Sequence, residues 1–188
     1  MANKMKRRVR RWTASAVILL LLVCGGVVLL RSLYPAHYAQ EIHAAAEKYD
    51  LAPSLIMAVI HTESGFDPEA RSSAGAIGLM QVTAPTMEWA LMRSGVSDKP
   101  TVEALTEPTF NIEVGSCVLQ LLGEQFSEQD TVLAAYNAGM GHVQTWLSQP
   151  DCSADGKTLH TIPFAETERY VKKVRRAQKI YQKLYGIS

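Results

Sequence analysis

Cysteine and histidine are scarce in this sequence, which contains only 3 cysteines and 5 histidines among its 188 residues. Cys24, Cys117 and Cys152 are far apart, and there is no CxxC pair or histidine cluster of the kind that builds a zinc site. We therefore expect no metal site and no bound cofactor. Outside the cytoplasm Cys117 and Cys152 could form a disulfide, and a buried free thiol at Cys117 is an equal alternative.

Charge is absent from residues 14–30, and residues 1–13 carry six cations without a single acidic residue. A helix that spans a bilayer needs about 20 residues, with about 17 as the lower limit. Trp12 and Tyr34 bracket the apolar run as interfacial anchors, and the basic side is expected to stay in the cytoplasm. We predict a basic cytoplasmic tail at 1–13, a transmembrane anchor at 14–33, a linker at 34–38 and an exported domain at 39–188.

Three other interpretations of this segment fit the sequence less well. A cleaved signal peptide has a shorter apolar core, whereas here the run continues through residues 25–30. A lipoprotein signal would place Cys24 after a small residue, but Val23 precedes it. A buried helix of a soluble protein would not explain six cations directly before the run. We therefore favour an uncleaved, single-pass anchor in the cell membrane, with the exported domain facing the cell wall.

The exported part lacks internal repeats, low-complexity tracts and any convincing pair of strands. Apolar residues recur at helical spacing in 42–49 and in 110–122, which predicts one compact, mainly helical domain. Asp130 is expected to cap a helix over 132–137 that stops at Gly139. Seven cations fall in the last helix, and we interpret them as a solvated face rather than a site for anionic polymers. Nothing suggests nucleic acid.

Glu63 follows the run LIMAVI at 55–60, which is apolar on every side of a helix and therefore typical of a buried one. Pro53 suits the first turn of that helix and Gly65 its left-handed exit, so Glu63 should lie in the last turn. The helix dipole and the apolar surroundings both disfavour a charged carboxylate there, so we expect a raised pKa for Glu63. A carboxyl that is protonated near neutral pH can act as a general acid.

Three short motifs follow one another in register: Glu63-Ser64-Gly65, then GLMQ at 78–81, then AYNAG at 135–139. In this order and spacing, and with Glu166-Thr167 and Tyr170 further on, the chain resembles the soluble-lytic-transglycosylase catalytic domain, a relative of goose-type lysozyme, from about residue 39 to residue 185. The resemblance implies a mainly α, lysozyme-like α+β fold. It also implies an enzyme that cleaves peptidoglycan glycan strands between N-acetylmuramic acid and N-acetylglucosamine and leaves 1,6-anhydro ends.

A hydrolase of the usual kind would present a second carboxylate, and the segment 72–81 contains none. Asp67 and Glu69 are more simply interpreted as solvated loop charges. This absence suits the resemblance, which implies that one glutamate, Glu63, serves first as acid and then as base while the substrate's own 6-hydroxyl attacks. A hydrolytic muramidase and a non-catalytic wall-binding component of an envelope machine stay open as alternatives.

The resemblance also implies substrate-binding roles, each with a structural alternative. Ser64 would bind substrate or cap the helix end, and Gln81 would orient a sugar amide. Met80 would contact the ring of the bound sugar, although packing in the protein core is the safer interpretation. Asn137 would face the acetamido sugar or simply cap the end of its helix. Tyr170 would hold the Glu63 carboxyl or simply belong to an apolar stripe. The predicted substrate-binding residues are Ser64, Met80, Gln81, Tyr136, Asn137 and Tyr170, and for Tyr136 a structural role is an equal alternative.

Overall fold

The computed structural model describes residues 2–96 and 100–187, with the side chains of all these except residues 2–11 and 13–16. The chain divides into two compact units, Met1–Ala36 and His37–Ser188.

The first unit is the helix α1 (Ala2–Leu33). Its described large apolar side chains, among them Leu22 and Val28, are exposed. Within the part of the chain that the structure describes, none of the helices combines the length and the apolar character that crossing a bilayer requires. The predicted span at 14–33 begins with residues 14–16, which lie outside the residues whose side chains are described.

The second unit is mainly helical, as the periodicity predicts, and it is compact. Its described residues form no β-strand; only two isolated bridges occur, Arg71 with Ile77 and Ile77 with Val82. In chain order its elements are α2 (Ala39–Tyr49), α3 (Pro53–Glu63), α4 (Ala84–Arg93), the 3₁₀-helix η1 (Val102–Thr106), α5 (Pro108–Gln125), α6 (Gln129–Ala138), α7 (Met140–Leu147) and α8 (Ala165–Tyr185).

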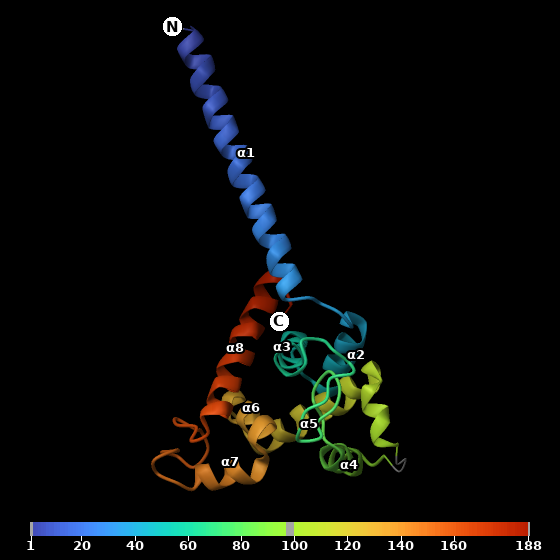
Figure 1. Ribbon diagram of the computed structural model, residues 1–188. Helices are drawn as coiled ribbons and strands as arrows, with labels where there is room; N and C mark the ends of the chain where they lie inside the picture. Colours follow the sequence, from blue (N-terminus) through green and yellow to red (C-terminus); the bar gives the residue numbers. More distant parts are fainter. Residues whose placement is uncertain (1, 97–99, 188) are drawn as a thin grey trace. The chain divides into compact units, whose positions relative to one another are not determined.

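The core of this unit is built on α5, which contacts α2, α4, η1 and α6 (Figure 1). Most of α5 is buried, including the small residues Gly115 and Ser116 and the polar residue Asn111. A helix that is buried on several sides needs an apolar surface all round, and α5 satisfies this with Ile112, Leu119 and other residues of its length. α5 therefore holds the other helices in place.

α3 and α8 lie side by side (Figure 1). Every residue of α3 from 54 to 60 is buried, as the LIMAVI run predicts. α8 is strongly amphipathic: Tyr170, Val174 and Tyr181 are buried on its inner face, and its cations lie on the outer one. Burial of the apolar faces of these two helices holds the end of α3 against α8, where Glu63 faces Tyr170 and the ring of His61 packs against Tyr181.

The ends of α3 agree with the sequence prediction. The helix begins at Pro53 and ends at Glu63, and Gly65 follows with a φ of +62°. The predicted cap of α6 is wrong. The Oε2 atom of Glu128 accepts a 2.9 Å hydrogen bond from the backbone N–H of Thr131, so Glu128 is the capping residue. Asp130 lies in the first turn, because the helix begins earlier than its apolar residues indicate.

All three cysteines are free thiols, so the disulfide between Cys117 and Cys152 is not formed. Cys117 is buried in α5, with its Sγ atom 3.0 Å from the Oγ atom of Ser94. Cys152 lies in the loop after α7, where its thiol faces the side chain of Gln149. The buried free thiol at Cys117 is therefore the alternative that the structure supports.

Candidate active site

The carboxyl of Glu63 lies at the end of α3, directly after the buried segment 54–60. Burial raises the pKa of Glu63 to about 7, and the hydroxyl of Tyr170 acts in the opposite direction by lowering it. The raised pKa follows from desolvation, because an ionised carboxylate loses its hydration when it leaves water. Near neutral pH a large fraction of Glu63 is therefore protonated, as a general acid requires.

Tyr170 comes from α8 and turns its hydroxyl toward Glu63. Its Oη atom is buried and has no hydrogen bond of normal length among the described residues. Burial, followed by the negative charge of Glu63, raises the pKa of Tyr170 well above its ordinary value. The phenol therefore stays protonated and is a donor for the carboxylate form of Glu63.

Tyr136 lies near the end of α6, and its hydroxyl donates a 2.8 Å hydrogen bond to the backbone carbonyl of Met80. Burial and then the charge of Glu63 raise the pKa of Tyr136 well above its ordinary value. Tyr136 and Tyr170 thus bring two neutral phenols from separate helices to the surroundings of one carboxyl. The hydrogen bond also ties the GLMQ segment, residues 78–81, to α6.

Asn111, which sequence reasoning missed, holds the GLMQ segment against α5. Its amide nitrogen donates to the carbonyls of Ile77 at 2.9 Å and Leu105 at 2.8 Å, and its Oδ1 atom accepts from the N–H of Met80 at 2.7 Å. A Cβ atom at Gly78 would come within 2.3 Å of the Leu105 carbonyl oxygen, so only glycine fits this close approach. A polar residue in an apolar helix was the only available sequence signal.

Ser64 links the end of α3 to the same segment. Its hydroxyl donates to the backbone carbonyl of Leu79 at 2.8 Å, and its oxygen accepts from the N–H of Phe66 at 3.1 Å. The Ser64 hydroxyl hydrogen is thereby used within the protein. This arrangement favours the capping alternative for Ser64 over direct contact with substrate.

Met80 and Gln81 use part or all of their side chains for contacts within the protein. Met80 is completely buried, and a Cβ atom at Gly115 would lie 2.5 Å from its sulfur, so its side chain fills the core beside α5. This burial favours the core-packing interpretation of Met80 over contact with the sugar ring. The side-chain nitrogen of Gln81 donates to the carbonyls of Ala70 and Gly78 at 3.1 and 3.0 Å. Only its amide oxygen is left for a ligand.

Asn137 follows Tyr136 in α6, and its Oδ1 atom accepts a 2.8 Å hydrogen bond from the hydroxyl of Thr167. Thr167 lies in the first turn of α8, one turn before Tyr170. The sequence presents Thr167 only as part of a motif and gives no sign of its contact with Asn137. The distance of 30 residues between them in the chain explains why.

Asp67 and Glu69 are exposed, and the Oδ1 atom of Asp67 accepts from the N–H of Glu69 at 2.9 Å within the loop. Among the described residues, the groups that shift the pKa of Glu63 include no second carboxylate. Both loop acids are thus solvated charges, as expected. Across the described ranges, no three His, Cys, Asp or Glu side chains are close enough to hold a metal ion.

A hollow of about 210 Å³ opens beside Tyr136. Trp89 and Thr86 of α4 lie on one side of it and Gly139 and Met140 on another. Trp89 is half-buried, and an indole ring offers a broad apolar face with one donor. The spacing of apolar residues in the sequence does not single out Trp89, because it belongs to an ordinary amphipathic helix.

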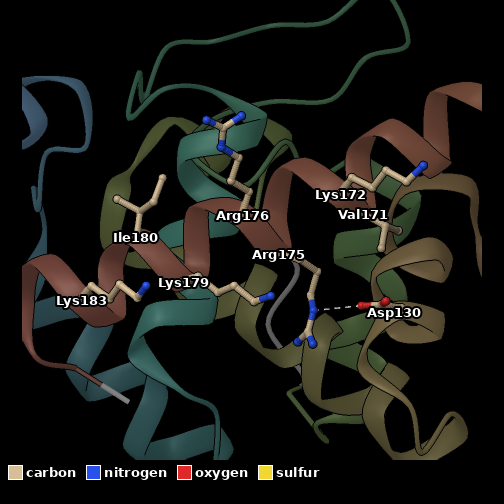
Figure 2. A pocket seen from close by; sticks show the side chains of 8 residues that line it. All are labelled: Asp130, Val171, Lys172, Arg175, Arg176, Lys179, Ile180 and Lys183. Atoms are coloured by element: carbon tan, nitrogen blue, oxygen red, sulfur yellow. Dashed lines mark ion pairs between the residues drawn. The ribbon is translucent and has the colours of Figure 1, made fainter.

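Another hollow, of about 650 Å³, lies on the outer face of α8 and is drawn in Figure 2. Cations of α8 line it together with Asp130 of α6, and the Nε atom of Arg175 lies 3.1 Å from the Oδ1 atom of Asp130. Arg175 also donates to the side chain of Gln129. These bonds join α8 to the start of α6, whose far end carries Tyr136 and Asn137. The hollow contains none of the candidate site residues.

Residues 40–158 match the Transglycosylase SLT domain family, and the chain belongs to that family. It is 33% identical over 159 residues to the soluble lytic murein transglycosylase of Salmonella typhimurium, a match that covers 84% of this chain and 25% of that protein. The chain therefore spans about a quarter of the length of this relative.

Two solved structures of lytic transglycosylases are similar to this chain. An inactive mutant of the lytic transglycosylase Slt of Pseudomonas aeruginosa, in which glutamine replaces a glutamate, has a TM-score of 0.71 and 32% identity over 81% of this chain and 25% of its own. The 70 kDa soluble lytic transglycosylase of Escherichia coli has a TM-score of 0.74 and 29% identity over 84% of this chain and 26% of its own. The fold of this chain is thus shared with about a quarter of each of these lytic transglycosylases.

Proposed function

We propose that this protein is a peptidoglycan lytic transglycosylase that cleaves the β-1,4 bond between N-acetylmuramic acid and N-acetylglucosamine without water. The observation that carries the proposal is the carboxyl of Glu63, which is half-buried, has its pKa raised to about 7 by desolvation and faces the hydroxyl of Tyr170. Among the described residues, no second carboxylate shifts its pKa. Membership of the transglycosylase SLT family supports the same activity.

The proposed reaction begins with proton transfer from Glu63 to the glycosidic oxygen, and the bond from that oxygen to C1 of the muramic acid breaks. The carbonyl oxygen of the 2-acetamido group supports the electron-poor C1. Glu63, now a carboxylate, takes the proton of the 6-hydroxyl, whose oxygen bonds to C1 and displaces the acetamido oxygen. The product is a 1,6-anhydro end, and Glu63 is protonated again. A carboxyl whose pKa lies near the working pH can both donate and accept a proton.

The other side chains have proposed roles that follow their contacts. Tyr170 stabilises the carboxylate form of Glu63 with its phenol hydrogen, and Asn137 offers its amide to the acetamido sugar. Tyr136 and Ser64 hold the GLMQ segment in place through the carbonyls of Met80 and Leu79. The free amide oxygen of Gln81 is a candidate acceptor for a substrate N–H.

The test of this assignment is Glu63→Gln, which keeps the size of the side chain but removes the transferable proton. The variant is expected to fold like the wild-type chain and to lose cleavage of purified peptidoglycan. Glu69→Gln, an equal change in an exposed loop, is the matched control and is expected to cleave normally. Wild-type cleavage by Glu63→Gln would refute the assignment.

We further propose that α1 anchors the protein in the cell membrane, with residues 1–13 in the cytoplasm and residues 39–188 on the wall side as the catalytic domain. The support is the uncharged run 14–30 behind six cations, together with exposed apolar side chains such as Leu20 and Leu29. A large exposed apolar surface marks an interaction site. The linker 34–38 reaches less than about 20 Å when extended, so membrane-proximal glycan would be the accessible substrate.

Extraction of membranes at alkaline pH tests the anchor. The full chain is expected to stay in the membrane pellet, whereas a variant with Leu20→Lys and Leu29→Lys is expected to move to the supernatant. Release of the wild-type chain by the same treatment would contradict the anchor while leaving the catalytic proposal untouched.

A further inference from the structure

Asn137 and Thr167 meet between two helices that are far apart in the sequence. The Oγ1 atom of Thr167 donates to the Oδ1 atom of Asn137 at 2.8 Å. Only 2% of the surface of Thr167 is exposed, so its hydroxyl has little access to water and depends on a partner inside the protein. The hydrogen bond is therefore a fixed feature of this part of the domain.

The bond occupies the oxygen end of the Asn137 amide. An asparagine side chain has one oxygen that accepts and one nitrogen that donates two hydrogens. The oxygen is occupied by Thr167, and among the described hydrogen bonds none involves the amide nitrogen of Asn137. Asn137 is half-buried rather than enclosed. It therefore presents a donor to a ligand and keeps its acceptor turned away.

The pair lies close to the candidate acid. Thr167 precedes Tyr170 by three residues, so both side chains lie on one face of α8. Tyr170 faces Glu63, and Tyr136, the neighbour of Asn137, is close enough for the charge of Glu63 to raise its pKa. Asn137, Thr167 and Tyr170 thus form one wall beside Glu63. A ligand that reaches Glu63 along this wall would meet the amide of Asn137.

We propose that Thr167 is a positioning residue that holds the Asn137 amide with its nitrogen toward the ligand, so that this wall selects a carbonyl oxygen such as that of an N-acetyl group. Without the threonine hydroxyl, the amide loses the partner that holds its oxygen, and it is free to leave the orientation that presents its nitrogen to the ligand. The inference rests on the proposed function of the site but concerns recognition of the substrate rather than bond cleavage.

The experiment measures binding by calorimetry in the full chain with Glu63→Gln, so that no cleavage occurs. The probes are the tetramer of N-acetylglucosamine and its fully N-deacetylated counterpart. The parent chain is expected to prefer the acetylated tetramer. Thr167→Val keeps the shape of the side chain without its hydroxyl and is expected to weaken binding of the acetylated tetramer about 3- to 10-fold. Binding of the deacetylated tetramer should change much less. Thr167→Ser should restore the preference.

A second background separates positioning from a merely structural role. In a chain that also carries Asn137→Ala, Thr167→Val is expected to have no further effect on binding, because the amide that it orients is gone. Equal weakening of both probes, the same loss in the Asn137→Ala background, or no preference in the parent chain would each overturn the proposal. Failure of the wild-type chain to cleave peptidoglycan would instead overturn the proposed function, and the binding comparison would still apply.

Discussion

The hydroxyl of Tyr136 donates a 2.8 Å hydrogen bond to the backbone carbonyl of Met80, across 56 residues of sequence. The bond joins the end of α6 to the segment that follows the catalytic candidate in the chain. A motif tyrosine is thus used to hold another motif in position, and the motifs that seemed separate in the sequence support one another in the fold.

Tyr136→Phe removes only this hydrogen bond. Since the Met80 carbonyl is left without its partner, the free energy of unfolding should fall by about 1 kcal/mol. Peptidoglycan cleavage should also slow, because the GLMQ segment is less firmly held. Urea denaturation and release of soluble glycan measure the two effects. Unchanged values in both measurements would show that the bond has no role in positioning.

Asn111→Ala should be more damaging. It leaves the backbone groups of Ile77, Leu105 and Met80 without their side-chain partner, and each unsatisfied buried group costs about 1–3 kcal/mol. We expect a large fall in the midpoint of thermal unfolding and loss of cleavage. Gln120→Ala on the same helix, whose exposed bond to Glu124 is local, is the control and should stay close to wild type.

Stability should depend on pH through Glu63. Its pKa is about 7 in the folded protein, and its ordinary value of 4.5 applies to the unfolded chain. Between these two pH values the folded protein therefore binds more protons than the unfolded chain does. The free energy of unfolding therefore falls as pH rises through this window. Glu63→Gln does not titrate at this position. The free energy of unfolding of the variant minus that of wild type should therefore grow by up to about 3 kcal/mol between pH 4.5 and pH 7.

Denaturation of both chains at several pH values measures this difference. Glu69→Gln, in the exposed loop, serves as the comparison. A constant difference between Glu63→Gln and wild type at every pH would contradict the raised pKa.

Tyr170→Phe should change the pH dependence of cleavage. The Tyr170 hydroxyl lowers the pKa of Glu63 while burial raises it, so its removal leaves burial unopposed and the pKa of Glu63 rises. The alkaline fall in kcat/KM should move to higher pH, and the rate should drop because the carboxylate has lost a donor. Tyr136→Phe, whose hydroxyl is bonded to Met80, is the control for the pH shift: it should slow cleavage without moving the alkaline fall. A shift to lower pH in Tyr170→Phe would refute this account.

Local patterns predicted the helices that carry the site, and long-range contacts could not be predicted from them. Pro53, Gly65 and the run between them define α3 correctly, because helix boundaries depend on near neighbours. The burial of Met80 depends on Gly115 of α5, and the orientation of Asn137 depends on Thr167 of α8. Such pairs leave no periodic signal in either segment, so the sequence identifies the motif residues without showing which of them touch the ligand.

The same distinction explains the error at Asp130. A helix cap is the residue whose side chain accepts hydrogen bonds from the first backbone N–H groups of the helix. By residue type Asp130 is a better candidate than Glu128, because aspartate is a preferred N-cap residue and glutamate is not. The structure distinguishes them because α6 begins one residue after Glu128, which leaves Asp130 free to pair with Arg175.

The measurement that tests the central claim most directly is the mass of the glycan ends released from purified peptidoglycan by the wild-type chain. Cleavage through Glu63 alone, with the substrate's own 6-hydroxyl as the attacking group, predicts 1,6-anhydro ends that are one water lighter than the reducing ends of a hydrolysed strand. Reducing ends as the main product, with incorporation of oxygen from isotopically labelled water, would contradict the account and favour a hydrolytic muramidase.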